Sequence, residues 1–108
     1  MTLISEPGYC RLALPSRDAD ATGDVAEIAS MYVAPADQGQ GVGSALMRAA
    51  FELAAGYRDV TLWVWERNAP ARRFYERCGF VADGARQDDP GTGLVDVRMR
   101  REVQGASG

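Results

Sequence analysis

A glycine-rich segment between a predicted strand and a predicted helix constrains this chain most strongly. Every second residue of the run Gln38–Ser44 is glycine, and the run joins an apolar stretch ending at Val33 to a helical pattern that begins at Val42. Glycine allows backbone conformations and close approaches that other residues do not, so successive N–H groups can converge on an anion. The helix that follows adds unpaired N–H groups and the positive end of its dipole. The segment therefore predicts a phosphate site, with a turn that only caps the helix as the structural alternative.

The spacing of these glycines excludes the two most common nucleotide-binding motifs. A dinucleotide fingerprint needs a third glycine three positions after its second, and here Ser44 stands three positions after Gly41. A P-loop closes with Lys followed by Ser or Thr, and this pair is absent from the run. The predicted phosphate site is therefore neither a dinucleotide fingerprint nor a P-loop.

Composition is that of one ordinary globular domain. The 108 residues are 46% hydrophobic and 25% charged, without an apolar run long enough to span a bilayer and without the basic start and apolar core of a signal peptide. We therefore expect a cytoplasmic protein with no membrane partner, and Cys10 and Cys78 as reduced thiols. Twelve basic and fifteen acidic residues give a net charge of −3, which disfavours nucleic acid as a partner and favours a cationic small molecule.

Turn residues and apolar periodicity divide the chain into seven predicted elements in the order β-β-α-β-α-β-β. The predicted strands are Tyr9–Leu14, Val25–Val33, Val60–Trp65, Phe80–Ala85 and Leu94–Val103. The predicted helices run from Val42 to a stop at Gly56, and from an N-cap at Asn68 to a stop at Gly79. The third strand is β-branched and aromatic throughout, which is typical of a strand covered on both faces. No repeat or linker divides these elements, which indicates a single domain.

Three patterns follow one another along the chain. The strand Glu27–Pro35 is followed by Gln38, Gly41 and Gly43, and then by the run Asn68–Phe80 with the spacing N-x-x-A-x-x-x-Y-x-x-x-G-F. With these motifs the chain resembles the GCN5-related N-acetyltransferases (GNAT) over most of its length. The resemblance implies an α/β (α+β) fold, a mixed and largely antiparallel sheet flanked by helices, whose two central strands splay apart to admit the pantetheine arm of acetyl-CoA. It makes residues 1–108 a single acetyl-CoA-binding N-acetyltransferase-like domain.

The resemblance also implies which residues hold acetyl-CoA, with no metal involved. Backbone N–H groups of the glycine loop would bind the pyrophosphate, and the strand Met31–Val33 would pair with the pantetheine amides, with the Val33 N–H facing the thioester oxygen. Asn68 would orient the pantetheine end and also suits a helix cap, and Ala71 must be small where the cofactor lies against the helix. The implied cofactor-binding residues are Met31, Tyr32, Val33, Gln38, Gly39, Gln40, Gly41, Val42, Gly43, Ser44, Asn68, Ala71 and Arg72.

Tyr75 is the residue that the resemblance assigns to proton transfer. When an amine attacks the thioester, a phenol held over the sulfur can protonate the leaving CoA thiolate. Spacing alone favours a core tyrosine on the apolar face of the helix, and the resemblance reverses that preference. Glu27 is the candidate general base, since it shares strand parity with Met31 and Val33 and could strip the ammonium group through a water. A merely solvated glutamate on an edge strand is the alternative interpretation.

The chain is shorter than the family that it resembles. Members usually have a strand, two helices and another strand before the segment that Tyr9–Leu14 resembles, and here only Met1–Gly8 precede that segment. The missing helices normally form one wall of the acceptor site, so we expect a domain truncated at its N-terminus and a homodimer that covers exposed apolar faces. Two functions stay open: transfer of acetyl to a primary amine, small molecule or peptide, by direct attack in a ternary complex, or a non-catalytic CoA-binding or interaction module.

Overall fold

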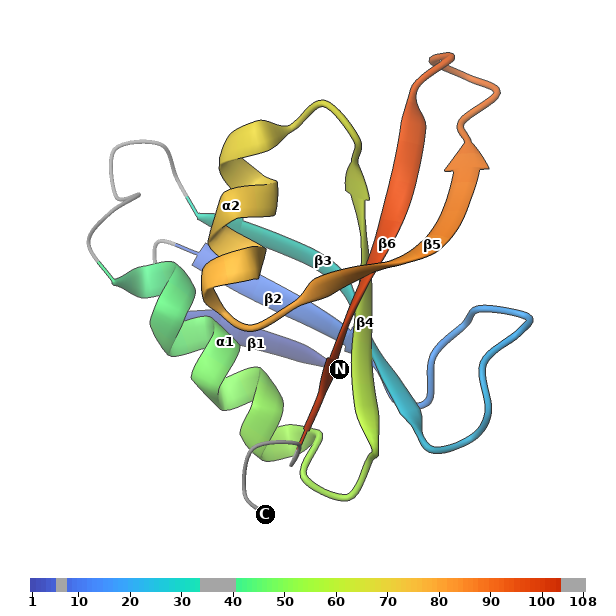
Figure 1. Ribbon diagram of the computed structural model, residues 1–108. Helices are drawn as coiled ribbons and strands as arrows, with labels where there is room; N and C mark the ends of the chain where they lie inside the picture. The colour runs from blue at the N-terminus through green and yellow to red at the C-terminus, as the bar shows by residue number, and fades with distance from the viewer. Residues whose placement is uncertain (6–7, 34–40, 104–108) are drawn as a thin grey trace.

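The computed structural model describes residues 1–5, 8–33 and 41–103, which form one six-stranded sheet and two helices (Figure 1). In chain order the elements are β1 (Thr2–Ser5), β2 (Gly8–Ala13), β3 (Val25–Val33), α1 (Val42–Leu53), β4 (Asp59–Trp65), α2 (Ala69–Arg77), β5 (Val81–Asp88) and β6 (Val95–Glu102). The strands lie side by side in the order β1-β2-β3-β4-β6-β5. Every neighbouring pair is antiparallel except β3 and β4, which are parallel. The predicted fold class, a mixed and largely antiparallel sheet, is confirmed.

The predicted element order lacked one strand. Thr2–Ser5 pairs with β2 in antiparallel register, with Leu3 opposite Cys10, and forms the edge of the sheet. The order is therefore β-β-β-α-β-α-β-β. Four residues are too few to show strand alternation, so this strand comes from its pairing with β2 rather than from a pattern of its own.

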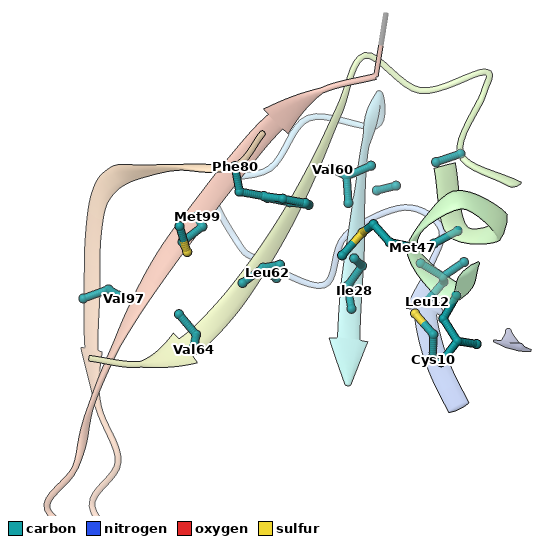
Figure 2. Close-up of a cluster of buried hydrophobic side chains, with 14 residues drawn as sticks. Cys10, Leu12, Ile28, Met47, Val60, Leu62, Val64, Phe80, Val97 and Met99 are labelled. Carbon is teal, nitrogen blue, oxygen red and sulfur yellow. The ribbon is translucent and has the colours of Figure 1, made fainter. Parts of the chain in front are cut away.

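Both helices lie on one face of the sheet and cover its apolar residues (Figure 1). Successive residues of a strand point to opposite faces, so alternate positions of β2, β3, β4 and β6 build one core with α1 (Figure 2). Ala71, Phe74 and Tyr75 of α2 are partly buried and pack against this core. The buried core residues are Cys10, Leu12, Ala26, Ile28, Leu46, Met47, Ala50, Ala54, Val60, Leu62, Val64, Phe80, Val97 and Met99. We call this side of the sheet the helix face, and the opposite side the open face.

In the strands Tyr9–Leu14 and Val25–Val33 and the helix Val42–Leu53, which were expected to lack cover on one side, the large apolar side chains are buried or half-buried except those of Tyr9, Tyr32 and Leu53. Leu12 of β2, Ile28 of β3 and Leu46 of α1 expose 4%, 4% and 2% of their surface, because α1 packs directly on β1, β2 and β3. The exposed aromatic residues of this region are Tyr9 and Tyr32, whose rings stack on each other with centroids 6.0 Å apart. This burial weakens the argument for a dimer that rested on uncovered apolar strands.

The two central strands pair over only half of their length. β3 and β4 are in register from Val25–Asp59 to Ile28–Leu62, and among the described residues their recorded pairing ends there. At the same point β3 shifts its register against β2, so that Ala29 is an extra residue in β3. Such a bulge bends a strand and increases its twist. Beyond Ile28, β3 and β4 diverge, as Figure 1 shows, and the predicted splay of the central strands is present.

Candidate functional site

Two hollows meet where β3 and β4 diverge. The first is a cavity of about 410 Å³ between the two strands, lined by residues 28–33 of β3, residues 62–65 of β4, and Asn68, Ala71 and Tyr75 of the α2 region. The second is a cleft of about 630 Å³ between the first turn of α1 and the length of α2. The residues that line both hollows are Met31, Val33, Asn68, Ala71 and Tyr75. The hollows therefore form one continuous path from the start of α1 to the gap between the strands.

The first turn of α1 forms the outer end of this path. Gly41 is the N-cap of α1 with φ of 84°, a left-handed conformation that favours glycine, and Gly41, Gly43 and Ser44 all line the cleft. A Cβ at Gly43 would lie 3.2 Å from the Phe74 ring of α2, so glycine also lets the two helices approach. The first turn carries no acidic residue, and Arg77 lines the same cleft. Unpaired N–H groups, the positive helix end and a guanidinium suit an anion.

Part of the predicted cradle cannot be compared with the structure. Gln38, Gly39 and Gln40 lie outside the described residues. Val42 begins α1 and packs against the hydrophobic core, and it is not among the residues that line the cleft. Of the seven predicted loop residues, the cleft itself therefore contains Gly41, Gly43 and Ser44.

Three predicted residues of β3 lie beside the cavity. Met31 and Val33 line both hollows and pack against the core, while Tyr32 lines the cavity between the strands with 49% of its surface exposed. This part of β3 pairs with β2 on its other side. The arrangement is compatible with a ligand lying along β3 on the side from which β4 diverges.

The α2 residues predicted to contact the cofactor divide into two groups. Asn68 caps α2, since its side-chain oxygen accepts a hydrogen bond from the Ala71 N–H at 3.3 Å, and both residues line the two hollows. The cap and the cavity role of Asn68 therefore coexist. Arg72, in contrast, donates from Nη1 to the Glu66 carbonyl at 3.0 Å and does not line either hollow. Its described contact anchors the start of α2 to the end of β4.

Tyr75 sits where the two hollows join. Its ring packs edge-on against Phe74 and Phe80, with centroid distances of 5.5 Å and 6.0 Å, and these contacts fix its direction. Among the described residues no hydrogen bond involves its hydroxyl. Burial raises the pKa of the Tyr75 phenol, and the nearby thiols Cys10 and Cys78 raise it further, so the hydroxyl carries its proton at neutral pH. The geometry provides a protonated phenol inside the path.

Glu27 is buried in the paired part of β3, one residue before the strands diverge. It exposes 1% of its surface and accepts four hydrogen bonds, from Ser16 Oγ (3.3 Å), from the Arg17 N–H (2.9 Å), and from Arg17 Nε (3.2 Å) and Nη2 (2.8 Å). Burial raises the pKa of this carboxyl, but the bonds from Arg17 outweigh that effect and hold the pKa below its usual value. Glu27 is therefore not a solvated surface residue: it anchors the β2–β3 loop, and its role as a base stays a prediction.

Several residues that line the path were not predicted as site residues. Pro70, Phe74, Arg77 and Cys78 complete the α2 side of the cleft, and Trp63 is one of the β4 residues that complete the cavity. Their signal was present for α2, because Ala71, Phe74, Tyr75 and Cys78 recur at helical spacing, but a core face gives the same spacing. The β4 residues look like an ordinary buried strand in the sequence, because the splay is not visible there.

The sequence matches the family model described as an acetyltransferase (GNAT) domain over residues 3–82. This chain belongs to the GNAT acetyltransferase domain family. The family recognised from the glycine loop and the α2 motif is thus confirmed. Within residues 1–5, 8–33 and 41–103, no group of three or more His, Cys, Asp or Glu residues could hold a metal ion, and no helix is long and apolar enough to cross a membrane.

Relatives of the GNAT domain extend this match. The chain is 46% identical over 59 residues to an uncharacterised N-acetyltransferase of Methanocaldococcus jannaschii, covering 53% of this chain and 26% of that relative. A GNAT-family crystal structure from Desulfovibrio desulfuricans is 31% identical with a TM-score of 0.73, covering 89% of this chain and 60% of that one. A Salmonella typhimurium protein solved with its cofactor acetyl-CoA is 24% identical with a TM-score of 0.72, covering 94% and 60%, and shows the same fold. The chain thus spans about a quarter of the curated relative and three fifths of the solved ones.

Proposed function

We propose that this domain binds acetyl-CoA in the path between α1, α2 and β3 and transfers the acetyl group to a primary amine. The observation that carries the proposal is the continuity of the two hollows. An anion site at the first turn of α1 leads past Ala71 to the gap between β3 and β4, where Tyr75 lies. This order matches a cofactor with a pyrophosphate at one end and a reactive thioester at the other. The GNAT family membership supports acetyl transfer, and the amine, the cofactor and the chemical steps are our inference.

The proposed reaction is a direct attack in a ternary complex. The neutral amine attacks the thioester carbon, and the carbonyl oxygen becomes an oxyanion, for which the Val33 N–H is the candidate donor. The attacking nitrogen gives its extra proton to solvent, and collapse of this intermediate breaks the C–S bond, leaves the amide and releases CoA as a thiolate. Tyr75 donates its phenolic proton to that sulfur, since its raised pKa keeps it protonated until the thiolate forms. Acetylated amine and CoA leave, and solvent returns the proton to Tyr75.

The base that deprotonates the ammonium group is proposed to be Glu27, acting through a water. Its bonds to Arg17 oppose this role, because they stabilise the carboxylate and make it a weak base. The replacement Glu27→Gln separates the two roles of this residue. Loss of turnover with unchanged stability supports the base, whereas loss of stability with unchanged turnover in the folded fraction identifies an anchor for the loop.

A non-catalytic CoA-binding or interaction module is the second candidate function. The observation that favours it is the engagement of Glu27 by Arg17, which makes the proposed base a weak one. The enzyme is favoured by Tyr75, which lines both hollows where they join. A screen of primary amines for release of the CoA thiol distinguishes them: CoA binding without turnover on any amine supports the module.

Replacement of Tyr75 tests the enzyme directly. Tyr75→Phe keeps the ring packing on Phe74 and Phe80 but removes the proton donor, so we expect kcat to fall roughly 10²- to 10⁴-fold with little change in acetyl-CoA affinity. Tyr57→Phe is the matched control, because Tyr57 packs against the core without lining either hollow. Unchanged kcat in Tyr75→Phe would make Tyr75 a packing residue.

A homodimer stays part of the proposal. Its remaining support is the exposed pair Tyr9 and Tyr32, which lies beside the cavity and would be covered by a second copy. Light scattering across a dilution series down to assay concentrations tests it. A protein that stays monomeric and active throughout removes the dimer and leaves the amine site open to solvent.

A further inference from the structure

Arg98 of β6 is a buried cation on the open face of the sheet. Its side chain is 8% exposed, and it bonds three carboxylates from two distant parts of the chain. Nη1 donates to Asp18 at 3.2 Å and to Asp20 at 2.8 Å, and Nε donates to Asp83 at 2.7 Å. Asp18 and Asp20 belong to the β2–β3 loop, and Asp83 belongs to β5. Arg98 therefore joins that loop to β5, the edge strand next to β6.

The same cluster holds the indole of Trp63 on the neighbouring strand. Trp63 Nε1 donates to the two carboxylate oxygens of Asp18 at 3.0 Å and 3.2 Å, and the Arg98 guanidinium carbon lies 5.5 Å from the Trp63 ring centroid. Asp18 thus fixes the edge of the indole while Arg98 covers one of its faces. Two independent contacts on one ring leave it little rotational freedom.

Trp63 also lines the cavity between β3 and β4. Its neighbours Leu62 and Val64 point into the core of the helix face, so the alternation of the strand directs Trp63 to the open face. The cofactor cleft runs along α1 and α2 on the helix face. An amine that reaches the thioester from the open face therefore meets Trp63 beside the gap.

We propose that Trp63 is a wall of the amine-acceptor site, and that Asp18 and Arg98 are positioning residues that hold its indole against the acceptor. The inference rests on the proposed acetyltransferase function and deepens it. It selects primary amines whose carbon skeleton can pack on a flat ring beside the reacting nitrogen. A cluster that only anchored the loop would need Arg98 and its carboxylates, but it would not need the bond from the Trp63 indole.

Steady-state kinetics with matched arginine variants test the positioning role. Arg98→Lys keeps the charge but loses the planar fork that bonds three carboxylates, so we expect the KM for the amine to rise roughly tenfold or more, with the Kd of acetyl-CoA unchanged. Arg100→Lys is the control: Arg100 lies on the same strand and face and bonds Asp59 and Asp83, but it makes no described contact with Trp63. Equal changes in both variants would overturn the inference.

A direct variant covers the case in which Arg98→Lys does not fold. Trp63→Phe keeps an aromatic ring but removes the N–H that Asp18 holds. We expect it to raise the KM for the amine while leaving the Kd of acetyl-CoA unchanged. An unchanged KM for every accepted amine would contradict the wall.

Fluorescence provides a readout that does not depend on turnover. The chain has two tryptophans, so Trp65→Phe leaves Trp63 as the single indole. In that background we expect Arg98→Lys, but not Arg100→Lys, to increase quenching of Trp63 by acrylamide. Equal quenching in both overturns the positioning role. If the parent protein acetylates no amine, both the proposed function and the acceptor wall are wrong. If the parent is active but the Arg98 and Arg100 variants cannot be distinguished, only this inference is wrong.

Discussion

The two faces of the sheet are stabilised by different forces. On the helix face, Leu62 and Met99 are buried against α1 and α2 in a continuous apolar core. On the open face, the same two strands carry Trp63 and Arg98, and the cover is a loop held by carboxylates. The apolar face needs only the right alternation of residues, while the charged face needs specific pairs from positions as far apart as Asp20 and Arg98.

This difference also separates the proposed tasks of the two faces. The free energy gained by apolar burial is roughly proportional to the area removed from water, and it does not depend on exact partners. A buried ion cluster adds little net stability, because desolvation opposes the attraction of the charges, but it fixes geometry. The cleft proposed to hold acetyl-CoA accordingly lies against the packed helices, and the proposed amine wall lies against the charged cluster.

The largest effect on stability is expected on the helix face. Phe80 is 1% exposed and packs against Phe51 and Tyr75, so Phe80→Ala should lower the free energy of unfolding by about 3–5 kcal/mol. Val81→Ala is the matched control, since Val81 follows Phe80 in the chain and its own side chain is 65% exposed. Urea unfolding of the two variants measures the difference. A small loss for Phe80→Ala would mean that the helix face does not dominate stability.

The next effect concerns the cofactor at the outer end of the cleft. Gly41 has φ of 84°, and a β-branched residue there is strained by about 1–3 kcal/mol. If the same loop geometry binds the pyrophosphate, Gly41→Val should weaken CoA binding roughly tenfold or more by calorimetry. Gly56→Val is the control, because Gly56 follows the other end of α1 without a left-handed φ. Unchanged CoA affinity in Gly41→Val would remove the cradle.

Most of the helix face could be predicted from the sequence. The start of α1 at Val42 and the cap of α2 by Asn68 are as predicted, because glycine, apolar spacing and capping residues act locally. β1 could not be predicted, since four residues at a sheet edge have no pattern of their own. β4 was expected to be covered on both faces, but Trp65 is 40% exposed, because β3 diverges before reaching it.

The open face was much less accessible to sequence reasoning. Glu27 was expected to be either a base or a solvated residue. It is buried and paired with Arg17, ten residues earlier, so the solvated interpretation is wrong and the base stays a prediction. Arg98 meets Asp18 across eighty residues, and no spacing rule relates them. The helix face has a similar case: Phe74 and Arg77 were visible on the helix, but their place in the cleft depends on the approach of α1 at Gly43. Long-range pairs decide this part of the site.

The third effect is a loss of stability in acid that originates on the open face. The folded pKa of Glu27 lies below its ordinary value of 4.5, so its contribution is complete above that value and is lost as pH falls through the folded pKa. Glu27→Gln should therefore flatten the decline of stability on acidification. Glu52→Gln, at an exposed position of α1, should leave the decline unchanged. Urea midpoints measured from pH 7 to pH 3 test both variants, and parallel curves would contradict the prediction.

The smallest effect is expected for an ion pair that belongs neither to the Arg98 cluster nor to the Glu27–Arg17 pair. Arg86 of β5 pairs with Glu66, but its side chain is 55% exposed against 8% for Arg98. Water and salt screen an exposed pair, so Arg86→Gln should leave the urea midpoint unchanged within error at 0.15 M salt, roughly the physiological ionic strength. Arg98→Gln should lower it clearly, because the carboxylates of Asp18 and Asp83 then lose a partner away from bulk water. Equal midpoints for the two variants would show that burial does not distinguish these arginines, and the open face would then be no more than a charged surface.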